Sequence, residues 1–432
     1  MKICYNFKNL FLALFASLVI IPPYFAFRIP GGIALSAHRI LLIGCIVQIF
    51  RDRSKLTKFL YLIRTASITY WFLLYAVVAF VNATYNRSPN TFIGPIIDNV
   101  ILFFIAYYAF YYEIEFHDIV EEFLRYMPIV LFFCIIQVAT KFNVFTLFDT
   151  IKEIDTSNSM RDGIVRCSGP YAHPLVLSLI FILLLPLMCY DKKRNSIYIF
   201  QHPILLVLSI IVLFLSGTRS GIAIYIVEVF VLLIISFPER KGKIVLISFT
   251  FIIACVITMF AFKDTPWVQY ILRYIFYIVD EVLGTSYALR FGGDISIQNS
   301  SNAREYIWML LQSDSIQKWI GQGTSRILEF QVGIKKIVSI DNFYVLQYIQ
   351  YGYPGMIIYL IIFVKTAIEC LKKSSKITIA MMVAFIGYFA NLTVVAQFNS
   401  LSYFFIMAAI IFANVKKQKN IRSVEDVGEE KD

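Results

Sequence analysis

The sequence predicts an all-α polytopic integral membrane protein with about twelve transmembrane helices and a large extracytoplasmic loop between the ninth and the tenth. Of its 432 residues, 59% are hydrophobic and 16% are charged, against about 25% charged in an ordinary soluble protein. Apolar runs of about 17 to 22 residues, long enough to cross a hydrocarbon core as helices, recur along the chain. A segment of roughly 80 residues after the ninth run is far longer than the usual connection.

The runs set the predicted spans and the division of the chain. They lie near 10–27, 33–50, 67–82, 92–112, 127–140, 174–190, 197–215, 221–237, 243–262, 343–364, 377–393 and 401–414. No small-residue cleavage site follows the first run, so we expect a membrane anchor and not a removed signal peptide. The predicted units are an N-terminal transmembrane bundle (1–262), the large outer loop (263–342), C-terminal helices (343–414) and a charged tail (415–432), which we expect to be disordered.

The basic residues predict the orientation. Segments on the N-terminal side carry 23 Lys and Arg, whereas the short segments on the other side carry seven. Because basic loops stay in the cytoplasm, both termini are predicted to be cytoplasmic in a multi-pass membrane protein. The net charge of +11 does not indicate nucleic-acid binding, since these residues punctuate apolar runs instead of forming one soluble basic surface.

Cysteines and histidines give no sign of a metal or cofactor. The seven cysteines are scattered without a CxxC pair, and the four histidines are far apart. Zinc sites and disulfide frameworks show regular ligand spacing, which is missing here. The sequence therefore predicts neither a metal site nor a cofactor.

The sharpest short motif is the connection from Ser216 through Gly217, Thr218, Arg219 and Ser220 to Gly221. Only small residues surround the arginine, so an anion can approach the backbone closely. The next helix begins at about Ser220, and its free N–H groups and positive dipole end face the same point. A guanidinium there can hold phosphate oxygens through two parallel hydrogen bonds. The alternative is an arginine that only reaches the membrane surface, although such arginines favour the cytoplasmic side.

The two long outer segments carry further candidates. Arg304 and Trp308 share one face of a predicted helix over 303–312, ahead of Gly321-Gln322-Gly323, and 267–283 has the spacing of an amphipathic helix at the interface. The alternative for Arg304 is a solvated charge. Arg166 and His173 flank a Ser-Gly-Pro stretch in segment 141–173, and the alternative for His173 is a hydrogen-bonded interfacial histidine.

Asp341 and Asn342 stand at the outer mouth of a predicted span. A carboxylate there can take a proton from a sugar hydroxyl, and the equal alternative is capping of the helix N-terminus. Arg39 and Asp98 lie inside predicted spans, where ionisable groups are costly and often functional. The two could also simply pair with each other.

Taken together, these motifs resemble the O-antigen ligase and polymerase family of membrane glycosyltransferases, with the C-type glycosyltransferase membrane fold. The similar stretches, in the family's order, are 166–174, 216–221, Arg304 with Trp308 and 321–323, and 341–344 with Gly352 and Gly355. Ligases of the family typically have His before Asn at the last motif, where this chain has Asp341. That departure makes the chain look more like the polymerases that join repeat units of O-antigen, capsule or exopolysaccharide.

The resemblance implies a donor and an acceptor glycan carried on undecaprenyl pyrophosphate, at the membrane, with a chain-length regulator as a possible further partner. Arg219 and Arg304 would hold the pyrophosphate and Asp341 would orient or deprotonate the acceptor hydroxyl. Arg166, His173, Ser216, Gly217, Thr218, Ser220, Trp308 and Asn342 are the candidate substrate-binding residues. Alternatives are an O-antigen ligase, a lipid-linked oligosaccharide flippase, which predicts short loops on both faces and broken helices deep in the membrane, and a scaffold without catalysis.

Overall fold

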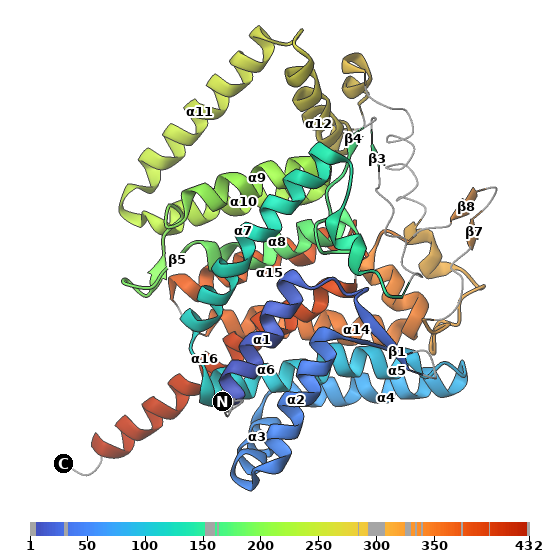
Figure 1. Ribbon diagram of the computed structural model, residues 1–432, viewed down its shortest axis with the longest axis vertical. Helices are drawn as coiled ribbons and strands as arrows, with labels where there is room; N and C mark the ends of the chain where they lie inside the picture. Colours follow the sequence, from blue (N-terminus) through green and yellow to red (C-terminus); the bar gives the residue numbers. More distant parts are fainter. Residues whose placement is uncertain are drawn as a thin grey trace.

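The computed structural model describes residues 6–29, 33–151, 160–161, 164–283, 285–292, 307–324, 330–332, 335–337, 340–372, 375–396 and 398–429. Within these residues the protein is predominantly helical, as predicted, and its strands form four separate antiparallel hairpins (Figure 1). The hairpins are the departure from an all-α fold.

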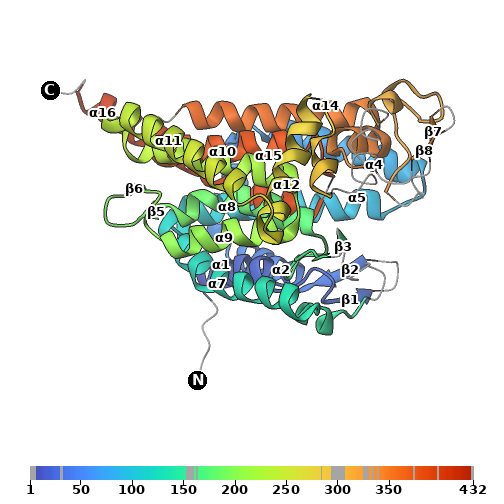
Figure 2. The same ribbon diagram turned by 90° about the horizontal axis from the view of Figure 1, so that it is seen from above.

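Most of the helices pack into one bundle, from which α11 and α12 project, and the strands sit at its two ends (Figures 1 and 2). The helices are α1 (Phe7–Ile20), α2 (Ala37–Arg51), α3 (Arg53–Thr65), α4 (Thr69–Tyr85), α5 (Asn90–Pro95), α6 (Leu102–Tyr108), α7 (Phe116–Thr140), α8 (Pro174–Met188), α9 (Pro203–Ser216), α10 (Arg219–Ser236), α11 (Lys241–Ala261), α12 (Pro266–Leu283), α14 (Phe343–Leu371), α15 (Lys376–Asn391) and α16 (Leu401–Glu429). The strands are β1 (Ala26–Ile29), β2 (Ile33–Ser36), β3 (Met160–Arg161), β4 (Ile164–Val165), β5 (Tyr190–Asp191), β6 (Ser196–Ile197), β7 (Phe330–Val332) and β8 (Lys335–Ile337).

Hairpins β1–β2, β3–β4 and β7–β8 gather at one end of the bundle, and β5–β6 lies at the opposite end (Figure 2). This grouping separates the segments that the basic residues assign to the outer and the cytoplasmic side. Which end faces the cytoplasm is still a prediction from the charges.

Four helical segments among the described residues are long and apolar enough to cross a membrane: Asn90–Glu113, Phe116–Thr140, Arg219–Ser236 and Phe343–Leu371. A fifth would be α3 with α4, a pair bent by 88° at its break, and four shorter apolar helices accompany them. Several apolar helices thus make this a multi-pass membrane protein, while the count of twelve spans stays a prediction.

Several predicted boundaries were wrong, chiefly where prolines interrupt apolar runs. The first run, 10–27, is helical only to Ile20, because Pro22 and Pro23 cannot continue the helix and the chain turns into β1. The second run begins as strand β2, and the seventh begins in hairpin β5–β6 before Pro203 opens α9. The tail was expected to be disordered, but α16 continues to Glu429.

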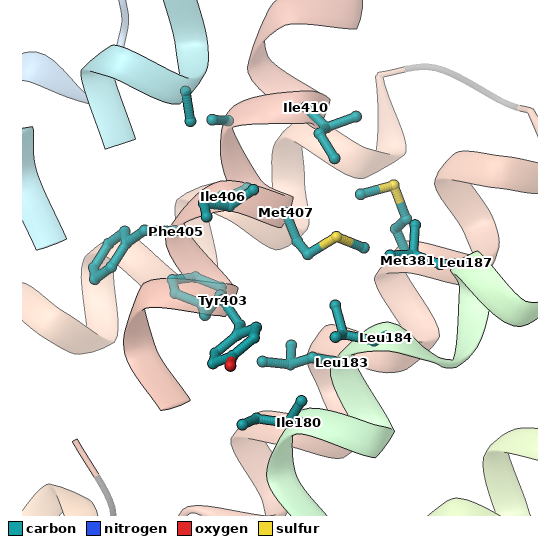
Figure 3. Packing of buried hydrophobic residues seen from close by; sticks show 14 of the residues in the cluster. Ile180, Leu183, Leu184, Leu187, Met381, Tyr403, Phe405, Ile406, Met407 and Ile410 are labelled. Carbon is teal, nitrogen blue, oxygen red and sulfur yellow. The ribbon is translucent and has the colours of Figure 1, made fainter. Parts of the chain in front are cut away.

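The largest hydrophobic core joins helices that are far apart in the sequence. Side chains of α8, α15 and α16 interlock in it, among them Leu184, Met381 and Met407 (Figure 3). Outward-facing positions are apolar as well, and on α4 the side chains of Leu73 and Val77 are 61% and 58% exposed. An exposed apolar surface of this kind would be unfavourable in water and fits lipid contact.

Candidate functional site: an arginine loop beside a polar cavity

The predicted motif at residues 216–221, which we call the arginine loop, connects α9 to α10. Gly217 ends α9 with φ +64°, a left-handed conformation that favours glycine. The Ser216 hydroxyl donates to the carbonyl of Leu213 at 2.7 Å and lies 2.9 Å from the Thr218 hydroxyl. Thr218 is the N-cap residue of α10, and Arg219 is its first residue. The loop is therefore held by its own small side chains, with the arginine at a helix N-terminus.

Gly221 brings the arginine loop against the start of α8. A Cβ at this position would lie 2.5 Å from Cβ of Ser178, so any larger residue would push α10 away from α8. The helix N-termini of α8 and α10 are consequently neighbours. Both helices direct the positive ends of their dipoles to the same end of the bundle.

Arg166 is brought to the arginine loop from the other predicted outer segment. Its Nε donates to the carbonyl oxygen of Ser216 at 2.7 Å, and the residue is only 9% exposed. Arg219 follows Ser216 by three residues, which span at most about 11 Å. The structure thus brings two separate motifs together, and it groups Arg166 with Arg219.

Segment 166–173 is fixed by amide side chains. Gln137 of α7 accepts from the backbone N–H groups of Ser168 and Gly169 at 3.0 and 3.1 Å, and Asn143 donates to the Gly169 carbonyl at 2.9 Å. At its end, Nδ1 of His173 accepts from the backbone N–H of Leu175 at 3.1 Å and caps α8. His173 therefore has a structural role as a hydrogen-bonded histidine, which was the alternative to substrate binding.

Helix α12 covers Arg219, a contact that the sequence did not indicate. The prediction of a helix over 267–283 is confirmed, and its Tyr277 ring lies 5.4 Å from Cζ of Arg219. Tyr277 is 4% exposed and Arg219 is 6% exposed. A cation over an aromatic face at this distance is attracted to the ring, so α12 positions the guanidinium.

Asp280 anchors the next turn of the large loop to α12. Its carboxylate accepts from the Thr285 hydroxyl at 2.6 Å and from the backbone N–H groups of Tyr287 and Ala288, each at 2.8 Å. Burial alone would raise the pKa of this carboxyl, but these hydrogen bonds outweigh burial and hold the pKa below its ordinary value. This part of the loop is therefore an ordered cover beside the arginine loop.

Asp341 and Asn342 precede α14. Asn342 caps the helix, because its Oδ1 accepts from the Val345 N–H at 3.0 Å, and its Nδ2 donates to the Thr393 carbonyl at 2.8 Å. Helix capping was one of the two alternatives predicted for this motif, and Asn342 is the residue that caps α14. Asp341 is half-buried beside it, and its proposed role with substrate stays a prediction.

A break in α14 explains the Gly321-Gln322-Gly323 motif. Pro354 has no N–H to donate to the Gln350 carbonyl, and Gly352 takes φ +69°. The Gly323 N–H donates to that carbonyl at 3.0 Å instead, and the Gln322 N–H donates to the carbonyl of Ile349 at 2.8 Å. The motif therefore completes the hydrogen bonds of a broken helix, a structural role for residues that resembled a family motif.

The other large-loop candidates receive less support. Arg304 lies outside the described residues, as does the whole start of the predicted helix, residues 303–306. Trp308 lies on the short helical turn that follows, and its side chain is 47% exposed. Whether these two residues bind substrate stays a prediction.

A cavity of about 470 Å³, whose wall mixes apolar side chains with several polar ones and which we call the polar cavity, opens among the elements at the same end of the bundle. The sequence did not predict it. Its wall includes Arg39 and Asp98, which pair as one of the alternatives expected: Nε of Arg39 donates to Oδ1 of Asp98 at 2.9 Å, and a second hydrogen bond joins Nη2 to Oδ2. Asp98 lies in the π-helical segment Ile96–Ile101, a distortion that is frequent at functional sites. His38, which suggested no partner in the sequence, has Nε2 3.7 Å from Oδ1 of Asp98.

The cavity also contacts three of the predicted motif regions. Tyr171 and Ala172 come from the segment after Arg166, Thr324 follows the Gly-Gln-Gly motif, and Gln347 and Gln350 lie on the first turns of α14. Glutamines three residues apart in an apolar run were a usable signal for such a site. The arginine loop itself does not line the cavity.

These features define a class: a helical multi-pass membrane protein with two buried arginines that meet at the N-terminus of one helix, and with a cavity at the same end of its bundle. Residues 204–360, a little over a third of the chain, match the family model described as O-antigen ligase. This match supports the resemblance of the chain to the O-antigen ligase and polymerase family that the motifs indicated. The matched range contains the arginine loop and α14 up to Leu360. A search of curated proteins finds no match.

Proposed function

We propose that the protein is a polymerase that joins oligosaccharide repeat units carried on undecaprenyl pyrophosphate, at the outer face of the bacterial cytoplasmic membrane. The supporting observation is the meeting of Arg166 and Arg219 at one loop, where Arg166 donates to the Ser216 carbonyl. A pyrophosphate is a dense anion, and two guanidinium groups beside helix N-termini suit it. The assembled polymer would be a surface polysaccharide such as O-antigen, capsule or exopolysaccharide.

The reaction is a displacement at the anomeric carbon of the donor sugar. The acceptor hydroxyl oxygen forms the new glycosidic bond, the bond from that carbon to the pyrophosphate oxygen breaks, and undecaprenyl pyrophosphate leaves with the bonding electrons. Asp341 takes the proton of the acceptor hydroxyl. Arg219 and Arg166 stabilise the charge that develops on the leaving group, which in a water-poor site contributes several kcal/mol. Arg304, which lies outside the described residues, is proposed to contribute a further positive charge.

Asp341 favours polymerisation over transfer of a finished polymer to a lipid A core. Ligases resembling this chain typically carry His where Asp341 stands. A carboxylate beside the capped start of α14 can act as a general base for a sugar hydroxyl. The ligase is the second candidate, favoured by the family description that residues 204–360 match.

The test is Arg219→Ala in cells that make the polysaccharide, with protein levels matched by immunoblot. We expect loss of the ladder of chain lengths and accumulation of single repeat units on the lipid carrier at the outer face. Arg194→Ala is the matched control, because Arg194 lies on the β5–β6 hairpin with 70% of its side chain exposed. The control should keep the full ladder.

Three outcomes would overturn this proposal. A normal ladder in Arg219→Ala would remove the arginine from the reaction. Long chains that stay on the carrier and fail to reach a lipid core would identify a ligase. Repeat units trapped on the cytoplasmic side would identify a flippase. A chain-length regulator, if it acts on this protein, would change the spacing of the ladder but not its presence.

A further inference from the structure

The polar cavity has the size and chemistry of a small-molecule site. Its volume of about 470 Å³ falls within the range of about 300–1,000 Å³ typical of ligand pockets. Its wall combines amide side chains such as Asn90, Asn99 and Gln347 with tyrosines such as Tyr171 and Tyr403. Amides can both donate to and accept from hydroxyl groups, and the aromatic rings offer apolar faces.

The charges in the cavity wall cancel. Arg39 and Asp98 form a bidentate ion pair, and Nη1 of Arg39 also donates to the Ala34 carbonyl at 2.5 Å. Among the described lining residues, the other ionisable group apart from tyrosine hydroxyls is His38. Its ring lies 3.0 Å from the Ser36 hydroxyl through Nδ1. The guanidinium of Arg39 is thus already engaged, so the cavity suits a neutral ligand better than a phosphate or an acidic sugar.

Two glutamines in the wall carry unused acceptors. Gln347 and Gln350 are 1% and 7% exposed, and the side-chain oxygen of each has no hydrogen-bond partner among the described residues. A buried acceptor left without a donor is unfavourable. A ligand with several hydroxyl groups would supply donors to both side chains at once, because the two residues lie three apart on α14 and so face the same side.

The position of the glutamines indicates whether the donor or the acceptor glycan enters the polar cavity. Gln347 lies on the first turns of α14, the helix that begins directly after Asp341 and Asn342. Asp341, the proposed base for the hydroxyl of the acceptor glycan, therefore lies at the same end of α14 as the unpartnered side-chain oxygens of Gln347 and Gln350. The arginines proposed for the donor pyrophosphate do not line the cavity.

We propose that this polar cavity binds a neutral, hydroxyl-rich sugar residue of the acceptor glycan through Gln347 and Gln350, with the Arg39–Asp98 pair as a rigid, charge-neutral wall. The inference rests on the proposed polymerase function and names the part of the acceptor that the protein recognises. Donor and acceptor then occupy different places: the donor pyrophosphate lies at the arginine loop and the acceptor sugar in the cavity.

The test measures binding directly and does not depend on catalysis. The probe is the free repeat-unit oligosaccharide, released from the lipid carrier of the producing cells by mild acid and therefore without pyrophosphate. It is titrated into the full-length protein in lipid nanodiscs by calorimetry. We expect Gln347→Leu and Gln350→Leu each to weaken binding about tenfold and the double variant further, while Arg219→Ala binds like the wild type.

Gln201→Leu is the matched control, because Gln201 is exposed just before α9 and does not line the cavity. Thermal unfolding must show that each variant is folded. If a glutamine variant unfolds, saturation-transfer NMR tests whether the free oligosaccharide binds in the cavity. The wild type is then compared with Asn90→Asp, a milder change of a lining residue. Unchanged affinity in folded glutamine variants, or no binding by the wild type, would overturn the inference.

Steady-state polymerisation separates this inference from the proposed function. If the cavity holds the acceptor, the glutamine variants raise the apparent KM for acceptor about tenfold and leave the maximal rate within about twofold. If they raise the KM for donor instead, the cavity belongs to the donor and the inference is wrong while the polymerase function stands. If Arg219→Ala keeps full activity, only the role of that arginine fails. If the wild-type protein forms no polymer, the proposed function fails, and the binding result still decides the chemistry of the cavity.

Discussion

The arginine loop and the polar cavity lie at the same end of the bundle but are built in opposite ways. The arginine loop is six consecutive residues, and Arg166 joins it through one hydrogen bond to Ser216. The cavity is assembled from segments as distant as Ser36 and Tyr403. A contiguous motif can be recognised in the sequence from its residue types. A cavity assembled from distant segments can be recognised only when the packing of the helices is known.

The two sites also manage charge differently. The arginine loop brings two guanidinium groups to the positive ends of helix dipoles, which concentrates positive charge for an anion. In the cavity, Arg39 faces Asp98 and its charge is neutralised. The contrast suggests that one site takes the charged part of a substrate and the other takes an uncharged part.

The largest expected effect is on the ion pair of the cavity. Asp98→Ala leaves the Arg39 guanidinium without its carboxylate, and breaking such a pair typically costs about 3 kcal/mol or more. We expect a clear fall in the free energy of unfolding measured by titration with dodecyl sulfate. The double variant Arg39→Met with Asp98→Leu should recover most of it, because neither charge remains. If the single variant is as stable as the wild type, the pair does not support the wall of the cavity.

A smaller loss is expected in the break of α14, directly after the lining residues Gln350 and Tyr351. Gly352 has φ +69° and ψ −174°, and a Cβ there would lie 2.6 Å from the backbone carbon of Trp319. Gly352→Ala should cost about 2 kcal/mol, because this conformation is essentially confined to glycine. Gly242→Ala is the matched control, since a Cβ at Gly242 meets nothing within 4 Å. Equal melting temperatures for the two variants would contradict this account of the break.

The sequence predicted the helical fold and the arginine loop, but it missed the cavity, and the reasons are physical. Apolar runs identify helices, because a backbone segment in lipid must satisfy its own hydrogen bonds and a helix does so. Proline positions explain the boundary errors, as at Pro22, where α1 has already ended. Arg39 and Asp98 were both noticed as intramembrane charges, and their pairing was one of two open alternatives. Gln347 and Gln350 were missed, because periodicity alone does not tell which face of an apolar helix meets a cavity.

Asn342 joins the start of α14 to the end of α15, and its loss should have an intermediate effect. It caps α14 and also ties that helix to the end of α15 through the Thr393 carbonyl. Asn342→Ala should cost about 1 to 1.5 kcal/mol, as for other N-caps. Asn342→Asp keeps the cap and loses only the bond to Thr393, so its melting temperature should fall between those of the wild type and the alanine variant. Two variants with the same melting temperature would assign the whole effect to the Thr393 contact.

The smallest effect is expected at the cover of the arginine loop. The Tyr277 ring lies 5.4 Å from Cζ of Arg219, and such a contact contributes about 0.5–1 kcal/mol. Tyr277→Leu removes the aromatic face and should raise the apparent KM for the lipid-linked donor about threefold, whereas Tyr277→Phe keeps the face and should stay near wild type. The KM for acceptor should not change in either variant, because Tyr277 does not line the cavity. A shift in acceptor KM instead would mean that the arginine loop and the cavity act as one site and that the division drawn between them is wrong.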